Sequence, residues 1–61
     1  MRERFEEVFE AVAEEFEMEW WELFDSDSFG EVERRLQAEF GEDVIDSEEF
    51  EAWVDEMAWE L

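Results

Sequence analysis

Carboxylates are almost the only side chains in this sequence that could do chemistry. The chain has 61 residues, of which 23 are Asp or Glu, and it contains no Cys, His, Lys, Tyr or Thr. Nucleophilic catalysis needs a nucleophile beside a general base, and Ser26, Ser28 and Ser47 stand among turn-forming residues without one. Paired carboxylates hydrolyse glycosides only across a sugar-binding cleft, which so short a chain is not expected to form. The sequence therefore predicts that the protein is not an enzyme.

One acidic segment resembles the start of an EF-hand calcium loop. Asp25, Asp27 and Gly30 occupy the first, third and sixth positions of that pattern. The pattern fails at Phe29, in the fifth position, and at Leu36, in the twelfth, because both positions require oxygen ligands. We interpret the segment as an acidic turn with a helix cap, and we expect no bound metal and no cofactor.

Helices must position the carboxylates, because the apolar residues recur at spacings of three and four. A first helix is predicted from Arg2 to Phe24, and its apolar stripe consists of Phe5, Val8, Phe9, Val12, Phe16, Trp20 and Leu23. The polar run Asp25 to Ser28 ends this pattern, since short polar side chains favour turns and caps.

Two shorter helices are predicted after this turn. Ser28 and Glu31 have capping-box spacing, and the helix that they begin carries Phe29, Val32, Leu36 and Phe40 before Gly41 stops it. A connector follows, in which Val44 and Ile45 turn inward. Asp46 and Glu49 offer a second cap for a helix from about Ser47 to the C-terminus, with a stripe of Phe50, Trp53, Val54, Met57 and Leu61.

Three amphipathic helices with short links predict an all-α fold, a small three-helix bundle with a long N-terminal helix, in one domain over residues 1–61. The first residues lack the apolar run of a signal peptide. No stretch approaches the roughly 20 apolar residues that span a bilayer. We therefore expect a cytoplasmic protein without a membrane partner.

The glutamates form a ridge on the predicted first helix. At about 100° per residue, the positions opposite the apolar stripe are Glu3, Glu7, Glu10, Glu14 and Glu17. Nine glutamates lie between Glu3 and Glu22, and over about 30 Å of helix their charge recurs about every 3.3 Å. One DNA strand carries a charge per roughly 3.4 Å. Ordinary solvated helix faces mix Glu with Lys, because like charges at i,i+4 destabilise a helix. The ridge therefore suggests imitation of a phosphate backbone.

Two tryptophans lie off the apolar stripes. Trp21 continues the line of the ridge, and Trp59 lies about 180° from Phe50 on its helix. Exposed tryptophan beside charge is typical of interface anchors, although different helix boundaries or a homodimer seam would also account for these rings. The third helix supplies part of a second acidic row, which includes Asp55. The candidate partner-binding residues are Glu3, Glu7, Glu10, Glu14, Glu17, Trp21, Asp55 and Trp59.

The formal net charge of −19 repels nucleic acid and anionic lipid, so the expected partner is basic. In composition and charge layout, though in no sequence motif, the whole chain resembles small acidic phage-encoded DNA mimics, which include anti-CRISPR and anti-restriction proteins. The resemblance implies an inhibitor that blocks the basic groove of a nucleic-acid-binding protein or effector complex. A CRISPR effector is the preferred target, because it holds nucleic acid in a long basic channel.

Three alternatives share the same composition. Salt adaptation also produces acidic, lysine-poor chains, but the 18 Glu against 5 Asp residues of this sequence depart from the more even ratio that we expect of halophiles. An acidic activation segment that folds on its partner would mix aromatic and acidic residues in the same way. An antitoxin-type neutraliser of a basic protein would use the same physics on a different target.

Overall fold

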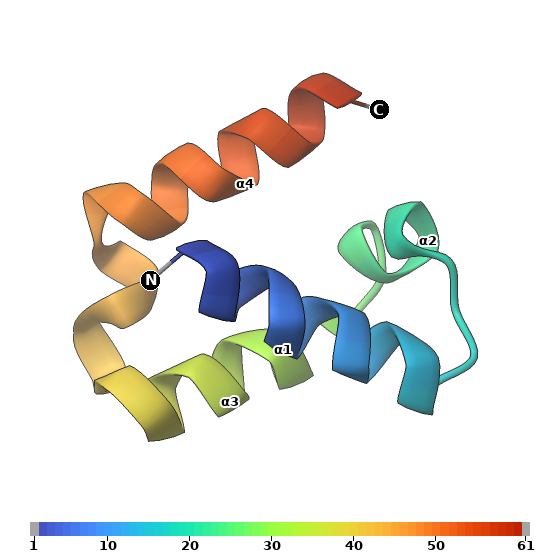
Figure 1. The fold of residues 1–61 in the computed structure, drawn as a ribbon, viewed down its shortest axis with the longest axis horizontal. Coiled ribbons are helices and arrows are strands. Elements are labelled where there is room, and N and C mark those ends of the chain that lie inside the picture. The colour runs from blue at the N-terminus through green and yellow to red at the C-terminus, as the bar shows by residue number, and fades with distance from the viewer. Residues whose placement is uncertain (1, 61) are drawn as a thin grey trace.

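A computed structural model describes residues 2–60 of the chain, and within that range it contains helices and no strand. The helices are α1 (Arg2–Glu15), α2 (Trp20–Phe24), α3 (Phe29–Phe40) and α4 (Glu48–Glu60), with a short 3-10 helix η1 (Glu42–Asp46) between α3 and α4. α1 crosses the middle of the molecule, with α3 along one side and α4 along the other (Figure 1). The all-α prediction is confirmed, and α1 is the helix against which the others pack.

The predicted first helix is interrupted, so the prediction of one continuous helix from Arg2 to Phe24 is wrong. The chain leaves α1 through Glu17, whose φ of 54° is left-handed. The Met18 N–H donates to the Ala13 carbonyl at 2.8 Å, and the Glu17 N–H donates to the Glu14 carbonyl at 3.1 Å. These two bonds form a Schellman C-cap, which usually places glycine where this chain has Glu17.

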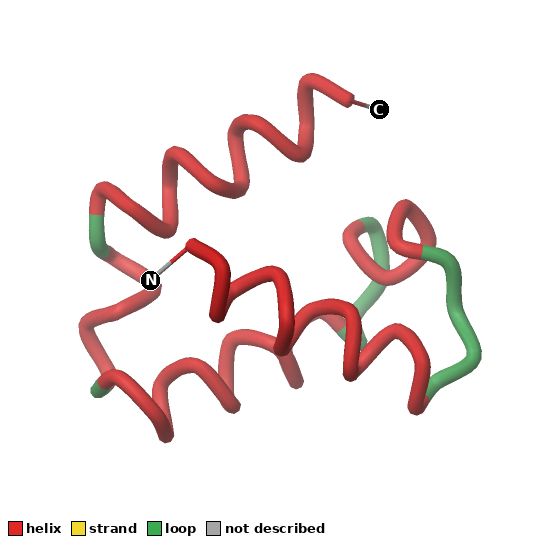
Figure 2. Tube along the Cα trace, in the orientation of Figure 1, coloured by secondary structure: helices red, strands yellow, loops and turns green. Residues whose placement is uncertain are grey.

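Figure 2 shows the loop between α1 and α2, and α2 begins directly after it, at Trp20. The Glu22 carboxylate accepts a hydrogen bond from the Glu19 N–H at 3.3 Å, which satisfies one free donor at the start of α2. α3 begins at Phe29 as predicted, but Ser28 makes no side-chain cap. Instead, the Ser26 hydroxyl accepts from the Ser28 N–H at 3.2 Å and donates to the Leu23 carbonyl at 3.0 Å.

Helix α3 ends where the sequence predicts. Gly41 has a φ of 108°, a backbone conformation that residues with a Cβ rarely adopt, and its N–H donates to the Gln37 carbonyl at 2.8 Å. α4 then begins at Glu48, capped by Ser47 rather than by Asp46, because the Ser47 hydroxyl accepts from the Phe50 N–H at 3.2 Å. Glycine and serine therefore set the α3–α4 connection.

The core is mostly aromatic and lies around α1. The Phe5 ring is fully buried and packs against the rings of Phe40, Phe50 and Trp53, with centroids 5.5 to 5.9 Å apart. Edge-to-face geometry adds to the apolar burial of such rings. The buried residues of the predicted stripes are Phe5, Val8, Phe9, Val12, Leu23, Val32, Leu36, Phe50, Trp53 and Met57, and Val44 of the connector is buried as predicted.

Some predicted core residues lie at the surface. Phe16 follows the end of α1 and is 43% exposed, because the chain turns away before that residue can face the core. Phe40, in the last position of α3, is 39% exposed although its ring contacts Phe5. Trp20 is half-buried. Leu61, the last residue of the predicted third stripe, lies outside the described residues.

Candidate acidic binding surface

The glutamate ridge exists on α1, in a shorter form than predicted. Glu3, Glu7, Glu10 and Glu14, here called the α1 ridge, are all exposed on the side of the helix away from its buried residues. Glu17 is also exposed, but it lies in the turn after α1 and does not continue the row. The break follows from the Schellman cap, which redirects the backbone at Glu17.

The shorter helix keeps the predicted charge density. α1 contains six glutamates in 14 residues, which corresponds to about one carboxylate per 3.5 Å of axis over about 21 Å. A DNA strand presents about six phosphates over that length. The match in spacing therefore holds on α1 alone, over about two thirds of the predicted length.

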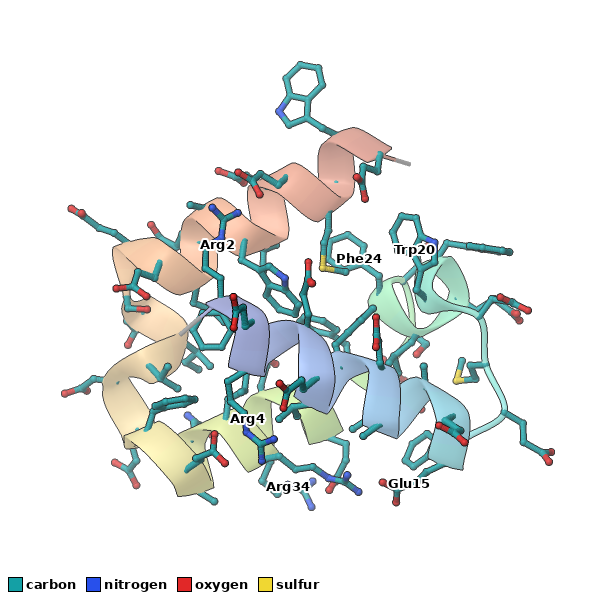
Figure 3. All side chains as sticks on the ribbon, in the orientation of Figure 1. Arg2, Arg4, Glu15, Trp20, Phe24 and Arg34 are labelled. Carbon is teal, nitrogen blue, oxygen red and sulfur yellow. The ribbon has the colours of Figure 1, made fainter. Side chains whose placement is uncertain are left out.

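All four arginines of the chain form ion pairs with its own glutamates. Arg4 of α1 donates to Glu39 of α3 at 2.7 Å and to Glu7 at 3.0 Å. Arg35 of α3 donates to Glu15 of α1 at 2.7 and 3.0 Å. Arg4, Arg34 and Glu15 are seen on the α1–α3 side in Figure 3. These pairs place positive charge along the junction of α1 and α3.

The remaining arginine pairs are at the start of α1 and on α3. Arg2 pairs with Glu56 of α4, and both Arg34 and Arg35 pair with Glu31 on their own helix. The Arg2–Glu56 pair is exposed to solvent and the Arg35–Glu31 pair is half-buried, and an exposed ion pair contributes little to stability. Their main effect is on the distribution of negative charge, because they neutralise some carboxylates and leave the others unpaired.

The inter-helix pairs also change the acidity of the glutamates. The hydrogen bond from Arg35, with its positive charge, lowers the pKa of Glu15 below its ordinary value, and the hydrogen bond from Arg4 lowers the pKa of Glu39 in the same way. Both arginines have raised pKa values for the same reason. Glu15 and Glu39 therefore stay ionised and paired at a pH below the ordinary pKa of glutamate.

Most of the carboxylates in residues 2–60 have no arginine partner. Glu7, Glu15, Glu31, Glu39 and Glu56 pair with arginine, so 18 of the 23 carboxylates have no arginine within ion-pair distance. On the α1 ridge, Glu3, Glu10 and Glu14 are in this group, whereas Glu7 is paired with Arg4. A surface with this excess of negative charge attracts a cationic partner from a distance.

The two predicted aromatic anchors are exposed. Trp59 of α4 is 88% exposed. Trp21 is 49% exposed and lies on α2 rather than in line with the α1 ridge, with its ring edge-to-face against Trp20 at a centroid distance of 5.9 Å. Asp55, also exposed, borders a shallow hollow that Ile45, Phe50, Glu51 and Val54 line. The eight candidate residues are therefore all on the surface, but they occupy three different helices and one turn.

The structure contains a pocket that the sequence did not predict. It has a volume of about 190 Å³ and is formed between α1, α2 and α4 by Glu6, Phe9, Glu10, Trp20, Trp53, Met57 and Glu60. We call it the Trp20 pocket. Sequence periodicity assigned Phe9, Trp20, Trp53 and Met57 to the core, and the opening between them depends on how α1, α2 and α4 meet in the fold.

The acidic turn before α3 is not arranged as a calcium site. The Phe29 ring packs edge-to-face on Phe24 and on Phe9, with centroid distances of 5.5 and 5.9 Å. Within residues 2–60, no group of three or more His, Cys, Asp or Glu side chains is placed to hold a metal ion. Of the helices described, none has the length and apolar content to cross a bilayer.

Comparison of the chain with protein-family models, with curated proteins and with solved structures found no match.

Proposed function

We propose that this protein binds the basic nucleic-acid-binding surface of a partner protein and blocks it by taking the place of the nucleic acid. The observation that carries the proposal is the arrangement of charge: the arginines are consumed in pairs within the chain, and 18 carboxylates remain unpaired. Six glutamates follow α1 at close to phosphate spacing, and four of them have no arginine partner. Such a surface suits a groove that evolved to hold phosphates.

The mechanism requires binding and no catalysis. The anionic surface would steer the protein toward a cationic groove and raise the association rate, and this effect weakens as salt is added. Trp21 and Trp59, which are exposed in the free protein, would become buried in the complex. They would then slow dissociation, because tryptophan buried at an interface contributes strongly to binding.

The preferred target class is an effector complex of a nucleic-acid-guided defence system or a restriction enzyme, which would make the protein an anti-defence inhibitor. CRISPR effectors hold a guide–target duplex in a positively charged channel and recognise it through its backbone. A short acidic helix can occupy part of such a channel without any sequence readout. On this proposal the protein acts in the cytoplasm, where it meets its target.

An antitoxin-type neutraliser remains the second candidate function. Trp59, at 88% exposed, favours a specific protein contact in either case. The two functions differ in the site that is covered, because a neutraliser can bind outside the nucleic-acid groove. Only the mimic must compete with nucleic acid.

Two pairs of substitutions test the proposal with an equal change in net charge, because each pair removes two negative charges. Glu3→Gln with Glu14→Gln neutralises unpaired positions of the α1 ridge, whereas Glu48→Gln with Glu49→Gln removes two exposed carboxylates of α4. Affinity for a purified guide-loaded CRISPR effector or restriction enzyme is measured across a salt series. We expect the ridge pair to weaken binding about tenfold more than the α4 pair, at about 1.4 kcal/mol per tenfold. Equal losses from both pairs would contradict a role for the ridge.

A further inference from the structure

We propose that the Trp20 pocket binds the side chain of an arginine from the basic partner. This inference rests on the proposed function, because it supplies the partner, and it adds a defined contact point to a surface otherwise described only by its charge. The chemistry of the pocket, its size and its lack of an internal cation all point to the same ligand.

The walls of the pocket suit a flat organic cation. Phe9, Trp20, Trp53 and Met57 form an apolar lining, and tryptophan binds cations over its ring face better than the other aromatic residues do. Trp20 is half-buried, so part of its indole remains open to a ligand. Figure 3 shows Trp20 on the side of α2 that faces the end of α4.

Among the described residues, no arginine pairs with the carboxylates at the pocket. Glu6, Glu10 and Glu60 line it together with the aromatic rings, and none of them pairs with an arginine of the chain. A neutral apolar guest would remove these carboxylates from water without giving them a partner, which is costly. A cationic guest would give them one.

Arginine fits better than lysine. Its guanidinium is planar and carries five donors in a rigid fork, so it can stack on an aromatic ring and bind carboxylates at the same time. The pocket, with a volume of about 190 Å³, has room for several water-sized groups, so a guanidinium group can enter it. Basic nucleic-acid grooves are rich in arginine, so the proposed partner would supply one.

The test uses capped hexa-arginine and hexa-lysine peptides, which carry equal charge, and follows binding by NMR of the tryptophan indole N–H and methionine methyl groups. We expect hexa-arginine to bind about tenfold more tightly, the size of a partly desolvated cation–π contact, with selective shifts at Trp20, Trp53 and Met57. Equal affinities, or shifts spread evenly over the four tryptophans, would overturn the inference.

Matched variants separate the pocket from general charge. The double variant Glu6→Gln/Glu60→Gln should lose the preference for arginine over lysine, and so should the single variant Trp20→Leu. The double variant Glu48→Gln/Glu49→Gln on α4 is the control and should keep the preference. If the α4 control lost the preference equally, the pocket would have no special role. Glu10 belongs to both the pocket and the α1 ridge and is therefore left unchanged, whereas the two substituted glutamates, Glu6 and Glu60, lie outside the ridge. Failure of these variants to lose the preference for arginine would therefore leave nucleic-acid mimicry standing. Conversely, if the pocket bound arginine but the protein never competed with nucleic acid, the mimicry proposal would be contradicted and the pocket proposal would stand.

Discussion

One substitution tests the break between α1 and α2. Whether it raises or lowers the free energy of unfolding depends on whether the helix is broken there. Glu17 holds a φ of 54°, and a left-handed residue with a Cβ costs roughly 1–2 kcal/mol relative to glycine. Glu17→Gly removes that cost but adds conformational entropy to the unfolded chain, worth about 0.4–1 kcal/mol. The expected net effect is a gain in unfolding free energy of about 0.5–1 kcal/mol.

Glu14→Gly is the matched control. It removes the same exposed carboxylate type three residues earlier, inside α1, where glycine is expected to destabilise the helix by about 0.5–1 kcal/mol. The two variants should therefore differ by about 1–2 kcal/mol, or roughly 5–15 °C in midpoint temperature for a domain of this size. Thermal unfolding followed by circular dichroism measures both. Equal destabilisation by the two variants would show that residue 17 lies within a continuous helix and would refute the structure of this segment.

Three further outcomes follow from the core and the charges. Phe5→Ala should lower the free energy of unfolding by about 3–5 kcal/mol, which is at least a third of the roughly 3–9 kcal/mol expected for this length. Denaturant unfolding followed by circular dichroism measures the loss, and a loss below about 1 kcal/mol would contradict the aromatic core. The midpoint temperature of unfolding should rise between about 10 and 150 mM salt, because the Debye length falls from about 30 to about 8 Å and repulsion among the carboxylates is screened. A fall in midpoint temperature would show that attraction within the ion pairs outweighs this repulsion. Because Arg35 lowers the pKa of Glu15 in the folded state, the stabilisation by Glu15 is present at neutral pH and is lost as pH falls through its folded pKa. The midpoint difference between the wild type and Glu15→Gln should therefore narrow at acid pH, and a difference independent of pH would rule out the ion pair.

The sequence predicted those helix ends that have a compositional signal. Gly41 and Ser47 are residues that stop and start helices, and α3 and α4 end and begin beside them. The end of α1 has no such signal, because Glu17 occupies the position where glycine is usual and glutamate is otherwise a good helix former. The only sign was indirect: Met18 and Trp21 do not fit the apolar stripe of a continuous helix.

The candidate surface was predictable only in part for the same reason. Exposure of Glu3, Glu10 and Trp59 follows from the helical period alone, since each lies opposite a buried stripe. The ion pair between Arg4 and Glu39 depends on how α1 and α3 pack, and the Trp20 pocket depends on three helices meeting. Local periodicity contains no information on either.

Competition with nucleic acid is the most direct test of the central claim. A guide-loaded effector or restriction enzyme is mixed with labelled nucleic acid and with this protein in both orders of addition, and the complexes are separated by native electrophoresis. The account predicts that each ligand excludes the other and that the apparent affinity for nucleic acid falls as the protein concentration rises. A ternary complex, in which the protein binds equally well while nucleic acid occupies the groove, would contradict the account.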